Sequence, residues 1–116
     1  MITGVGVDLV SISRLSRLLS KVSSLEKNIF SLRERDLPIR SKAGNIAAKE
    51  AMVKAGLLNG FKSFRDIEIL REIEGAPQII RQNQAMKSTT EKCIDIRISI
   101  SYMDDMALAL VVCQDM

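Results

Sequence analysis

Hydrophobic and polar positions alternate with a period of two residues near both ends of this chain. Residues 2–10 and 94–101 alternate in this way, and residues 106–113 form a more continuously apolar run. Alternation predicts β-strands with one buried face, and a continuous apolar run predicts a strand that is buried more completely. We also expect a shorter antiparallel pair of strands at 66–71 and 78–81, joined by a turn.

The middle of the chain has a different pattern. Residues 43–55 are rich in alanine and other helix formers, which predicts a helix. On a helical wheel the alanines share one face, whereas Lys42, Asn45 and Lys49 fall on the opposite face. We therefore expect that opposite face to be exposed to solvent.

Three ionisable residues stand at positions that look unfavourable for them. Glu50 and Lys54 lie within the alanine face, where a charged pair costs free energy unless it is joined or bound to something. One interpretation is an i, i+4 ion pair at the edge of the core, worth about 0.2–0.5 kcal/mol. Asp8 lies in a predicted strand, where Asp is disfavoured, after Gly4 and Gly6, which permit close approach of another backbone or a ligand. Asp8 is either an exposed strand residue or part of a site.

A second helix is expected at residues 11–22, with Ser11 as its N-cap. Arg14, Arg17 and Lys21 line one face of this helix. A charged row is usually a solvated face, but its single sign also makes it a candidate docking surface for an acidic protein.

Together these elements predict an α+β fold, in which an antiparallel sheet packs against the long Ala-rich helix. Ser31 with Glu34 has the form of a capping box, which predicts a short helix or turn before Pro38. The sequence has no internal repeat, low-complexity segment or linker, so we expect residues 1–116 to form a single domain.

The composition narrows the chemistry. The chain has 116 residues, a net charge of +3, two cysteines and no histidine. A histidine-based triad or zinc site is therefore excluded, and any acid–base or metal chemistry must use carboxylates and lysines. Cys93 and Cys113 are expected to be buried, reduced thiols. The mild positive charge fits an acidic partner, a phosphate ligand or nucleic acid, although the single Tyr and the absence of Trp offer little for base stacking.

The N-terminus lacks a basic region followed by an apolar signal core, and no uncharged apolar run approaches membrane-spanning length. We expect a soluble, cytoplasmic protein.

Four patches in sequence order resemble the holo-acyl carrier protein synthase type of 4′-phosphopantetheinyl transferase. They are residues 4–10 (GVGVDLV), 47–51 (AAKEA) with Lys54, 64–69 (FRDIEI) followed by 74–77 (EGAP), and 98–101 (ISIS). The first two patches are specific, and the strand patches are weak when taken singly. The resemblance implies an enzyme that moves 4′-phosphopantetheine from coenzyme A to a serine of apo acyl carrier protein. The by-product is adenosine 3′,5′-bisphosphate, and the reaction supports fatty acid biosynthesis.

The resemblance implies that Asp8 and Glu50 bind Mg²⁺ together with the diphosphate of coenzyme A, which suits the preference of that ion for oxygen ligands. Lys54 matches a lysine near the same diphosphate and completes the implied catalytic set. The base that takes the proton of the acceptor serine stays open between Asp8 and Glu50, acting through a metal-bound water.

The implied coenzyme A contacts are Lys54, Gly75, Pro77, Ser101 and Tyr102. The implied carrier-protein contacts begin at Arg14, which matches a basic position on the docking helix of the family, and Arg17 and Lys21 extend that face. Family members commonly form homotrimers with active sites between subunits. Nucleic acid and membrane are not expected partners.

The sequence departs from the family pattern at three positions that are cationic there. Asn45 replaces an arginine, Ala76 replaces a lysine and Tyr102 replaces a histidine. Loss of one charge-assisted bond to phosphate costs roughly 1–2 kcal/mol, which predicts weaker coenzyme A binding. The departures keep open a non-catalytic relative that binds carrier protein or nucleotide on the same scaffold, whereas the retained catalytic set favours the enzyme. A small basic nucleic-acid-binding domain is a third, weaker alternative.

Overall fold

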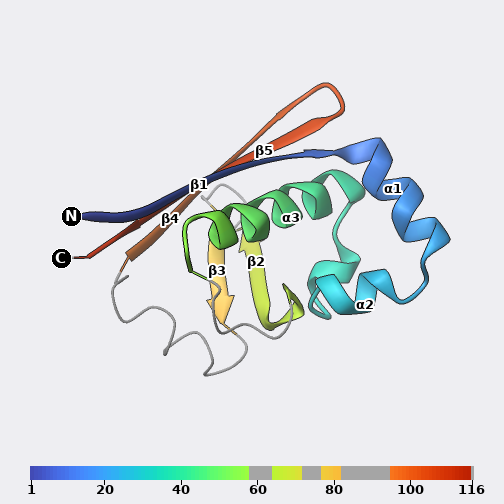
Figure 1. Ribbon diagram of the computed structural model, residues 1–116. Helices are drawn as coiled ribbons and strands as arrows, with labels where there is room; N and C mark the ends of the chain where they lie inside the picture. The colour runs from blue at the N-terminus through green and yellow to red at the C-terminus, as the bar shows by residue number, and fades with distance from the viewer. Residues whose placement is uncertain (58–63, 72–76, 82–94, 116) are drawn as a thin grey trace.

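The computed structural model describes residues 1–57, 64–71, 77–81 and 95–115 (Figure 1). Its elements, in chain order, are β1 (Ile2–Ser11), α1 (Ile12–Lys21), α2 (Leu25–Ile29), the 3₁₀ helix η1 (Glu34–Asp36), α3 (Ile39–Lys54), the 3₁₀ helix η2 (Phe64–Asp66), β2 (Ile67–Arg71), β3 (Pro77–Arg81), β4 (Asp95–Met103) and β5 (Met106–Gln114).

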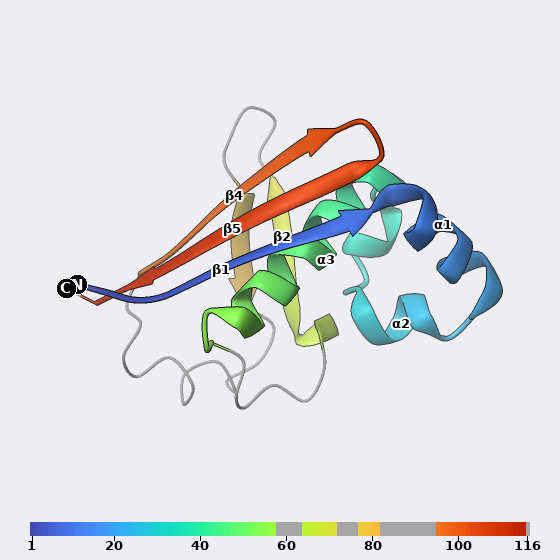
Figure 2. The same ribbon diagram turned by 45° about the horizontal axis from the view of Figure 1, so that its top comes forward.

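The long helix α3 lies between two antiparallel sheets (Figures 1 and 2). One sheet has the strand order β1-β5-β4, and the other is the pair β2-β3. Alanines of α3 share one hydrophobic cluster with isoleucines of β2 and with small residues of β5. The predicted α+β fold, with an antiparallel sheet packed on the Ala-rich helix, is confirmed, although the sequence did not separate the strands into two sheets.

The strand β1 approaches the backbone of α3 at its two glycines. A Cβ atom at Gly6 would lie 1.8 Å from the carbonyl oxygen of Ala51, and one at Gly4 would lie 2.2 Å from the carbonyl oxygen of Ala55. Any side chain at these positions would force strand and helix apart. The close approach that the glycines and alanines suggested is therefore present, and it brings Asp8, on the same face of β1, toward α3.

The face of α3 opposite its alanines is buried, so the prediction of an exposed face is wrong. Asn45 is nearly covered and Lys49 is completely covered, while Lys42 is largely covered and pairs with Glu26. The reason is that β2 and the chain before α3 pack against this side of the helix. A helix between two layers has no broad solvent face, so its polar residues need partners inside the protein.

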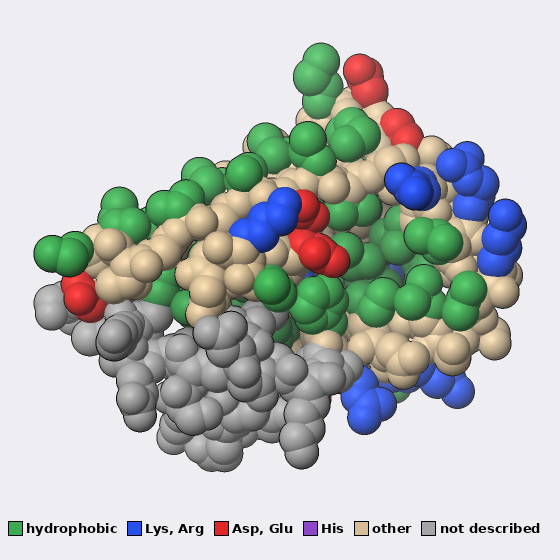
Figure 3. Space-filling view, in the orientation of Figure 1, with side chains coloured by type: hydrophobic (Ala, Val, Ile, Leu, Met, Phe, Trp, Pro, Cys, Tyr) green, Lys and Arg blue, Asp and Glu red, His purple; other side chains and the backbone are tan. Residues whose placement is uncertain are grey.

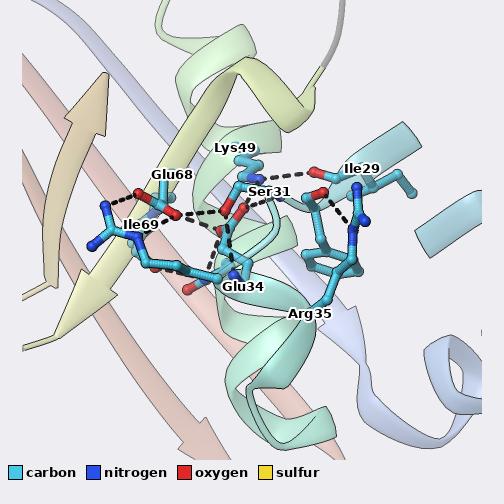
Figure 4. Close-up of polar contacts among 10 residues, drawn as sticks. Ile29, Ser31, Glu34, Arg35, Lys49, Glu68 and Ile69 are labelled. Carbon is cyan, nitrogen blue, oxygen red and sulfur yellow. Dashed lines mark hydrogen bonds and ion pairs between the residues drawn. The ribbon is translucent and has the colours of Figure 1, made fainter. Parts of the chain in front are cut away.

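A buried polar network provides those partners (Figure 4). Lys49 Nζ donates to Glu34 Oε1 at 2.7 Å and to the carbonyl oxygen of Ile29 at 2.9 Å. Asn45 Nδ2 donates to Glu34 Oε2 and to the carbonyl oxygen of Ile69, both at 2.8 Å. Burial lowers the pKa of Lys49, and the Glu34 carboxylate opposes that shift. Asn45 thus occupies a structural position in this chain.

The predicted capping box forms the other end of this network. The Ser31 N–H donates to Glu34 Oε1 at 3.0 Å, and the Glu34 N–H donates to Ser31 Oγ at 3.3 Å, ahead of η1. Ser31 Oγ also donates to Glu68 Oε1 at 2.8 Å, and Arg33 pairs with the same fully buried carboxylate. In the described ranges, no buried side-chain polar atom is without a hydrogen-bond partner.

The two cysteines were expected to be buried, reduced thiols. Cys113 is buried in β5, but its sulfur is in a disulfide, so the prediction of a reduced thiol is wrong. A low cysteine count argues against a framework of several bridges and does not exclude a single one. Cys93 lies outside the described residues. No helix in the described part of the chain is long and apolar enough to cross a membrane.

Candidate active site

The contact between β1 and α3 brings the three implied catalytic residues into one neighbourhood. Lys54 Nζ lies 2.8 Å from Asp8 Oδ1 and 3.2 Å from the carbonyl oxygen of Val7. Lys54 therefore pairs with Asp8 and not with Glu50, so the i, i+4 pair is not formed. Glu50 precedes Lys54 by one helical turn and lies on the same side of α3. Figure 3 shows acidic and basic side chains meeting where β1 crosses α3.

The donor set at this contact fits a divalent cation that arrives with a phosphate-bearing substrate. Within the described residues, Glu50 makes no ion pair and no side-chain hydrogen bond, and no three His, Cys, Asp or Glu side chains cluster as metal ligands. Mg²⁺ is commonly bound by one or two carboxylates, with phosphate oxygens and water completing its shell. Asp8 and Glu50 can supply two such oxygen ligands, whereas they cannot form a complete protein cage.

A second cluster of polar residues surrounds Tyr102 of β4. The Arg40 guanidinium lies 4.5 Å from the centroid of the Tyr102 ring, and the Arg71 guanidinium lies 5.9 Å from it. The hydroxyl of Tyr102 occupies the space that a Cβ atom at Gly44 would need. Neither arginine has an ion-pair partner in the part of the chain that the structure describes. Two cations without an ion-pair partner among the described residues therefore lie beside Tyr102, where the family pattern has a histidine.

The strand register relates this cluster to Asp8. Asp8 pairs with Ala109 of β5, which pairs with Ile100 of β4, and Tyr102 follows Ile100 by two residues on the same face. Two strand spacings and two residues separate the Cα atoms of Asp8 and Tyr102 by roughly 12 Å. Ser101 is exposed on the opposite face of the sheet, so the structure does not bring it together with Tyr102 within one chain.

Of the other two implied coenzyme A contacts, Pro77 is described by the structure and Gly75 is not. Pro77 begins β3 and pairs in register with Arg71, so it lies near the arginine that approaches Tyr102. Gly75 and Ala76 lie outside the described residues. Sequence reasoning missed Arg40 and Arg71, because each is an isolated arginine whose significance depends on three separate elements meeting.

The implied docking face lies on α1. Arg14, Arg17 and Lys21, which we call the basic row, are all exposed, and Leu15 anchors the helix in the core. Basic side chains gather at this end of the molecule (Figure 3). The predicted N-cap is confirmed, since the Arg14 N–H donates to Ser11 Oγ at 3.2 Å.

Two carboxylates and a lysine where a strand meets a helix, with two arginines around Tyr102, about 12 Å away, that have no ion-pair partner among the described residues, suit the binding of a phosphate-bearing substrate. Residues 4–111 match the family model of the 4′-phosphopantetheinyl transferase superfamily, and the chain belongs to that superfamily. This finding confirms the family resemblance seen in the sequence.

Individual relatives match over nearly the whole chain. The holo-[acyl-carrier-protein] synthase of Leifsonia xyli subsp. xyli is 37% identical over 115 residues, which cover 97% of this chain and 96% of that protein. The crystal structure of the Neisseria meningitidis enzyme of the same name gives a TM-score of 0.85 at 31% identity, covering 99% of this chain and 100% of that one. The Helicobacter pylori enzyme, crystallised in complex with coenzyme A, gives 0.77 at 30% identity and covers 95% and 99%.

Proposed function

We propose that this protein is a holo-acyl carrier protein synthase, a transferase that moves 4′-phosphopantetheine from coenzyme A to a serine of apo acyl carrier protein. The observation that carries the proposal is the Asp8–Lys54 pair beside Glu50, at a glycine-lined contact, in a chain of this superfamily. The names of the full-length relatives support the reaction, and the Helicobacter pylori complex supports coenzyme A as the substrate. The proposal includes one domain over residues 1–116 and a cytoplasmic location.

In this mechanism the serine oxygen forms a bond to the phosphorus next to pantetheine, and the bond to the bridging diphosphate oxygen breaks. A Mg²⁺ ion held by Asp8 and Glu50 would supply positive charge at the attacked and leaving phosphates. Lys54 would hold its ammonium at the leaving phosphate, which departs as adenosine 3′,5′-bisphosphate. The serine proton passes to Asp8 or Glu50 through water, because the chain has no histidine.

The direct test is the mass of the carrier protein. The protein is incubated with coenzyme A, Mg²⁺ and apo acyl carrier protein, and the carrier is weighed by mass spectrometry. We expect a gain of one phosphopantetheine group that disappears when Mg²⁺ is chelated. No gain with folded protein, over a wide range of coenzyme A concentrations and with several carriers, would leave the non-catalytic binding relative as the better reading.

Arg40 and Arg71 are proposed to bind a phosphate of coenzyme A beside Tyr102, where they would replace cations that the family pattern has and this chain lacks. We expect Arg40→Gln with Arg71→Gln to raise KM for coenzyme A about tenfold, since charge-assisted bonds to phosphate are lost. Steady-state kinetics with coenzyme A as the varied substrate measures this effect. Lys27→Gln removes an exposed cation from α2 and should change nothing. An unchanged KM in the double variant would show that the two arginines serve only to pack Tyr102.

The sheet face away from α3 supports an oligomer. It exposes apolar side chains of β1 and β5, namely Val5, Val7, Leu9, Met106, Leu108 and Leu110. Figure 3 shows hydrophobic side chains in a row over these strands. A contiguous apolar face of this kind is typical of a protein interface, and we propose that it joins the subunits of a homotrimer.

Val7→Glu should therefore dissociate the oligomer, because it places a charge in the apolar face. Light scattering after size exclusion measures the mass. Val53→Glu is a matched control, since Val53 of α3 is 47% exposed and Val7 is 50% exposed. A monomeric natural protein, or a Val7→Glu variant with the natural mass, would contradict the trimer.

A further inference from the structure

Asp105, in the turn between β4 and β5, is bonded to the start of α1. Its Oδ2 accepts hydrogen bonds from Ser11 Oγ at 2.7 Å and from Ser13 Oγ at 2.6 Å, and its Oδ1 accepts from the Ser13 N–H at 2.9 Å. The Asp105 carbonyl oxygen also accepts from the Ile12 N–H at 2.8 Å. Segments more than 90 residues apart in the sequence are joined here.

These bonds supply what α1 lacks in its own sequence. The helix has no acidic residue in its first turn, although a negative charge there stabilises the positive end of the helix dipole. Asp105 provides that charge from another element. Hydrogen bonds from the Ser13 and Ser11 hydroxyls lower the pKa of Asp105, so the carboxylate stays ionised at lower pH than usual.

The same turn connects the start of α1 to the strands that carry the site. Ser11 Oγ accepts the N–H of Arg14, the first residue of the basic row, and donates to Asp105. From Asp105 the chain continues into β5, which pairs with β1 at Asp8. The start of the basic row and the carboxylate of Asp8 are thus both connected to the β4–β5 hairpin, the first through hydrogen bonds to Asp105 and the second through strand pairing.

We propose that Asp105 is a positioning residue for carrier-protein docking. By fixing the first turn of α1, it holds the basic row at a set distance from Asp8, so that the acceptor serine of a docked acidic carrier reaches coenzyme A. This inference rests on the proposed function. Asp105 acts through Ser11 and Ser13 and touches no substrate.

The test compares Asp105→Asn with Asp104→Asn. Both variants remove one negative charge from the same turn, but Asp104 makes no side-chain hydrogen bond or ion pair within the described residues. Electrostatic attraction alone predicts that both variants bind an acidic carrier slightly more tightly, because the surface becomes more positive. If Asp105 positions α1, Asp105→Asn binds the carrier more weakly, whereas Asp104→Asn does not.

We expect Asp105→Asn to raise KM for apo acyl carrier protein about three- to tenfold, because it weakens the capping contacts that fix the first turn of α1. KM for coenzyme A should stay unchanged, and Asp104→Asn should bind the carrier as tightly as the natural protein or slightly more tightly. Fluorescence anisotropy of labelled apo carrier, without coenzyme A, should give the same rise in Kd. Equal carrier constants in both variants, or an equal rise in the coenzyme A constant, would overturn the proposal.

Two further comparisons distinguish a failure of this proposal from an unfolded variant and from a failure of the proposed function. If Asp105→Asn is unfolded at the assay temperature, Ser13→Ala must raise the carrier constants, because it removes a donor on α1 and keeps the charge. Unchanged carrier constants in that variant overturn the proposal. If the natural protein transfers nothing, the proposed function fails, and the anisotropy comparison still decides whether Asp105 positions α1.

Discussion

Asp8→Asn is expected to lower kcat/KM for phosphopantetheine transfer by about 100-fold or more, and Glu50→Gln by a similar factor. Each change removes one charged oxygen from the two carboxylates proposed to hold the cation, and electrostatic stabilisation of a developing charge is commonly worth this much. Rates are measured by the mass assay while Mg²⁺ is varied. We expect both variants to need more Mg²⁺ for their residual rate.

The loss should not reflect unfolding. The Asp8–Lys54 pair is partly exposed, with 55% of the lysine side chain accessible, and such pairs contribute about 0–1 kcal/mol. Melting curves should therefore stay close to that of the natural protein. Asp36→Asn, which removes an exposed acid from η1, is the control for charge. Full activity of Asp8→Asn at the Mg²⁺ concentration that suffices for the natural protein would refute the proposed role of Asp8 as a ligand of the cation.

Lys49→Met should lower the free energy of unfolding by about 3–5 kcal/mol, because it leaves the Glu34 carboxylate buried without its cation. Both side chains of this pair are fully covered, and Lys49 also donates to the carbonyl oxygen of Ile29, which would lose its donor. Urea unfolding, followed by circular dichroism, measures the change.

Lys54→Met is the matched control, since it makes the same substitution in the same helix at an exposed pair. It should cost about 0–1 kcal/mol. Adding Glu34→Gln to Lys49→Met should recover part of the loss, because no unpaired buried charge remains. Equal effects of the two lysine variants on stability would mean that the buried pair contributes no more than a surface pair.

The elements of this fold were predictable from local pattern. A period of two residues identified β1 and β4, and alanine content identified α3, because strands and helices place successive side chains on their faces with a fixed period. In β1 the apolar face, with Val5, Val7 and Leu9, is nevertheless exposed in the single chain, and the face with Gly4 and Gly6 packs on α3. The capping box at Ser31 and Glu34 was predictable for the same reason, since its partners are three residues apart.

The burial of Lys49 and Asn45 was not predictable from the helical wheel. The wheel sorts residues by polarity and assumes that a polar face meets water, whereas here the polar face meets Glu34 and the backbone of β2. Which segment covers a helix depends on tertiary packing, and that information is spread over distant positions.

The candidate site was predictable only in part. Asp8, Glu50 and Lys54 stood out because each is a charge at a position where packing is expected. The partner of each residue could not be predicted, because the Asp8–Lys54 pair joins residues that are 46 positions apart in the sequence. Arg40, Arg71 and Asp105 carry no local signal, because an isolated charge acquires its meaning from the strand register and the helix that it meets.

The missing side chains at Gly4 and Gly6 have a consequence for the dynamics of the protein. With β1 and α3 in direct backbone contact, neither element can open to solvent without the other losing its packing surface. Amide hydrogens of residues 6–10 and 48–54 should therefore exchange with deuterium as one cooperative unit. The segments that carry the two proposed metal ligands, Asp8 and Glu50, would then unfold and refold together, so that the two carboxylates are either both in position or both displaced.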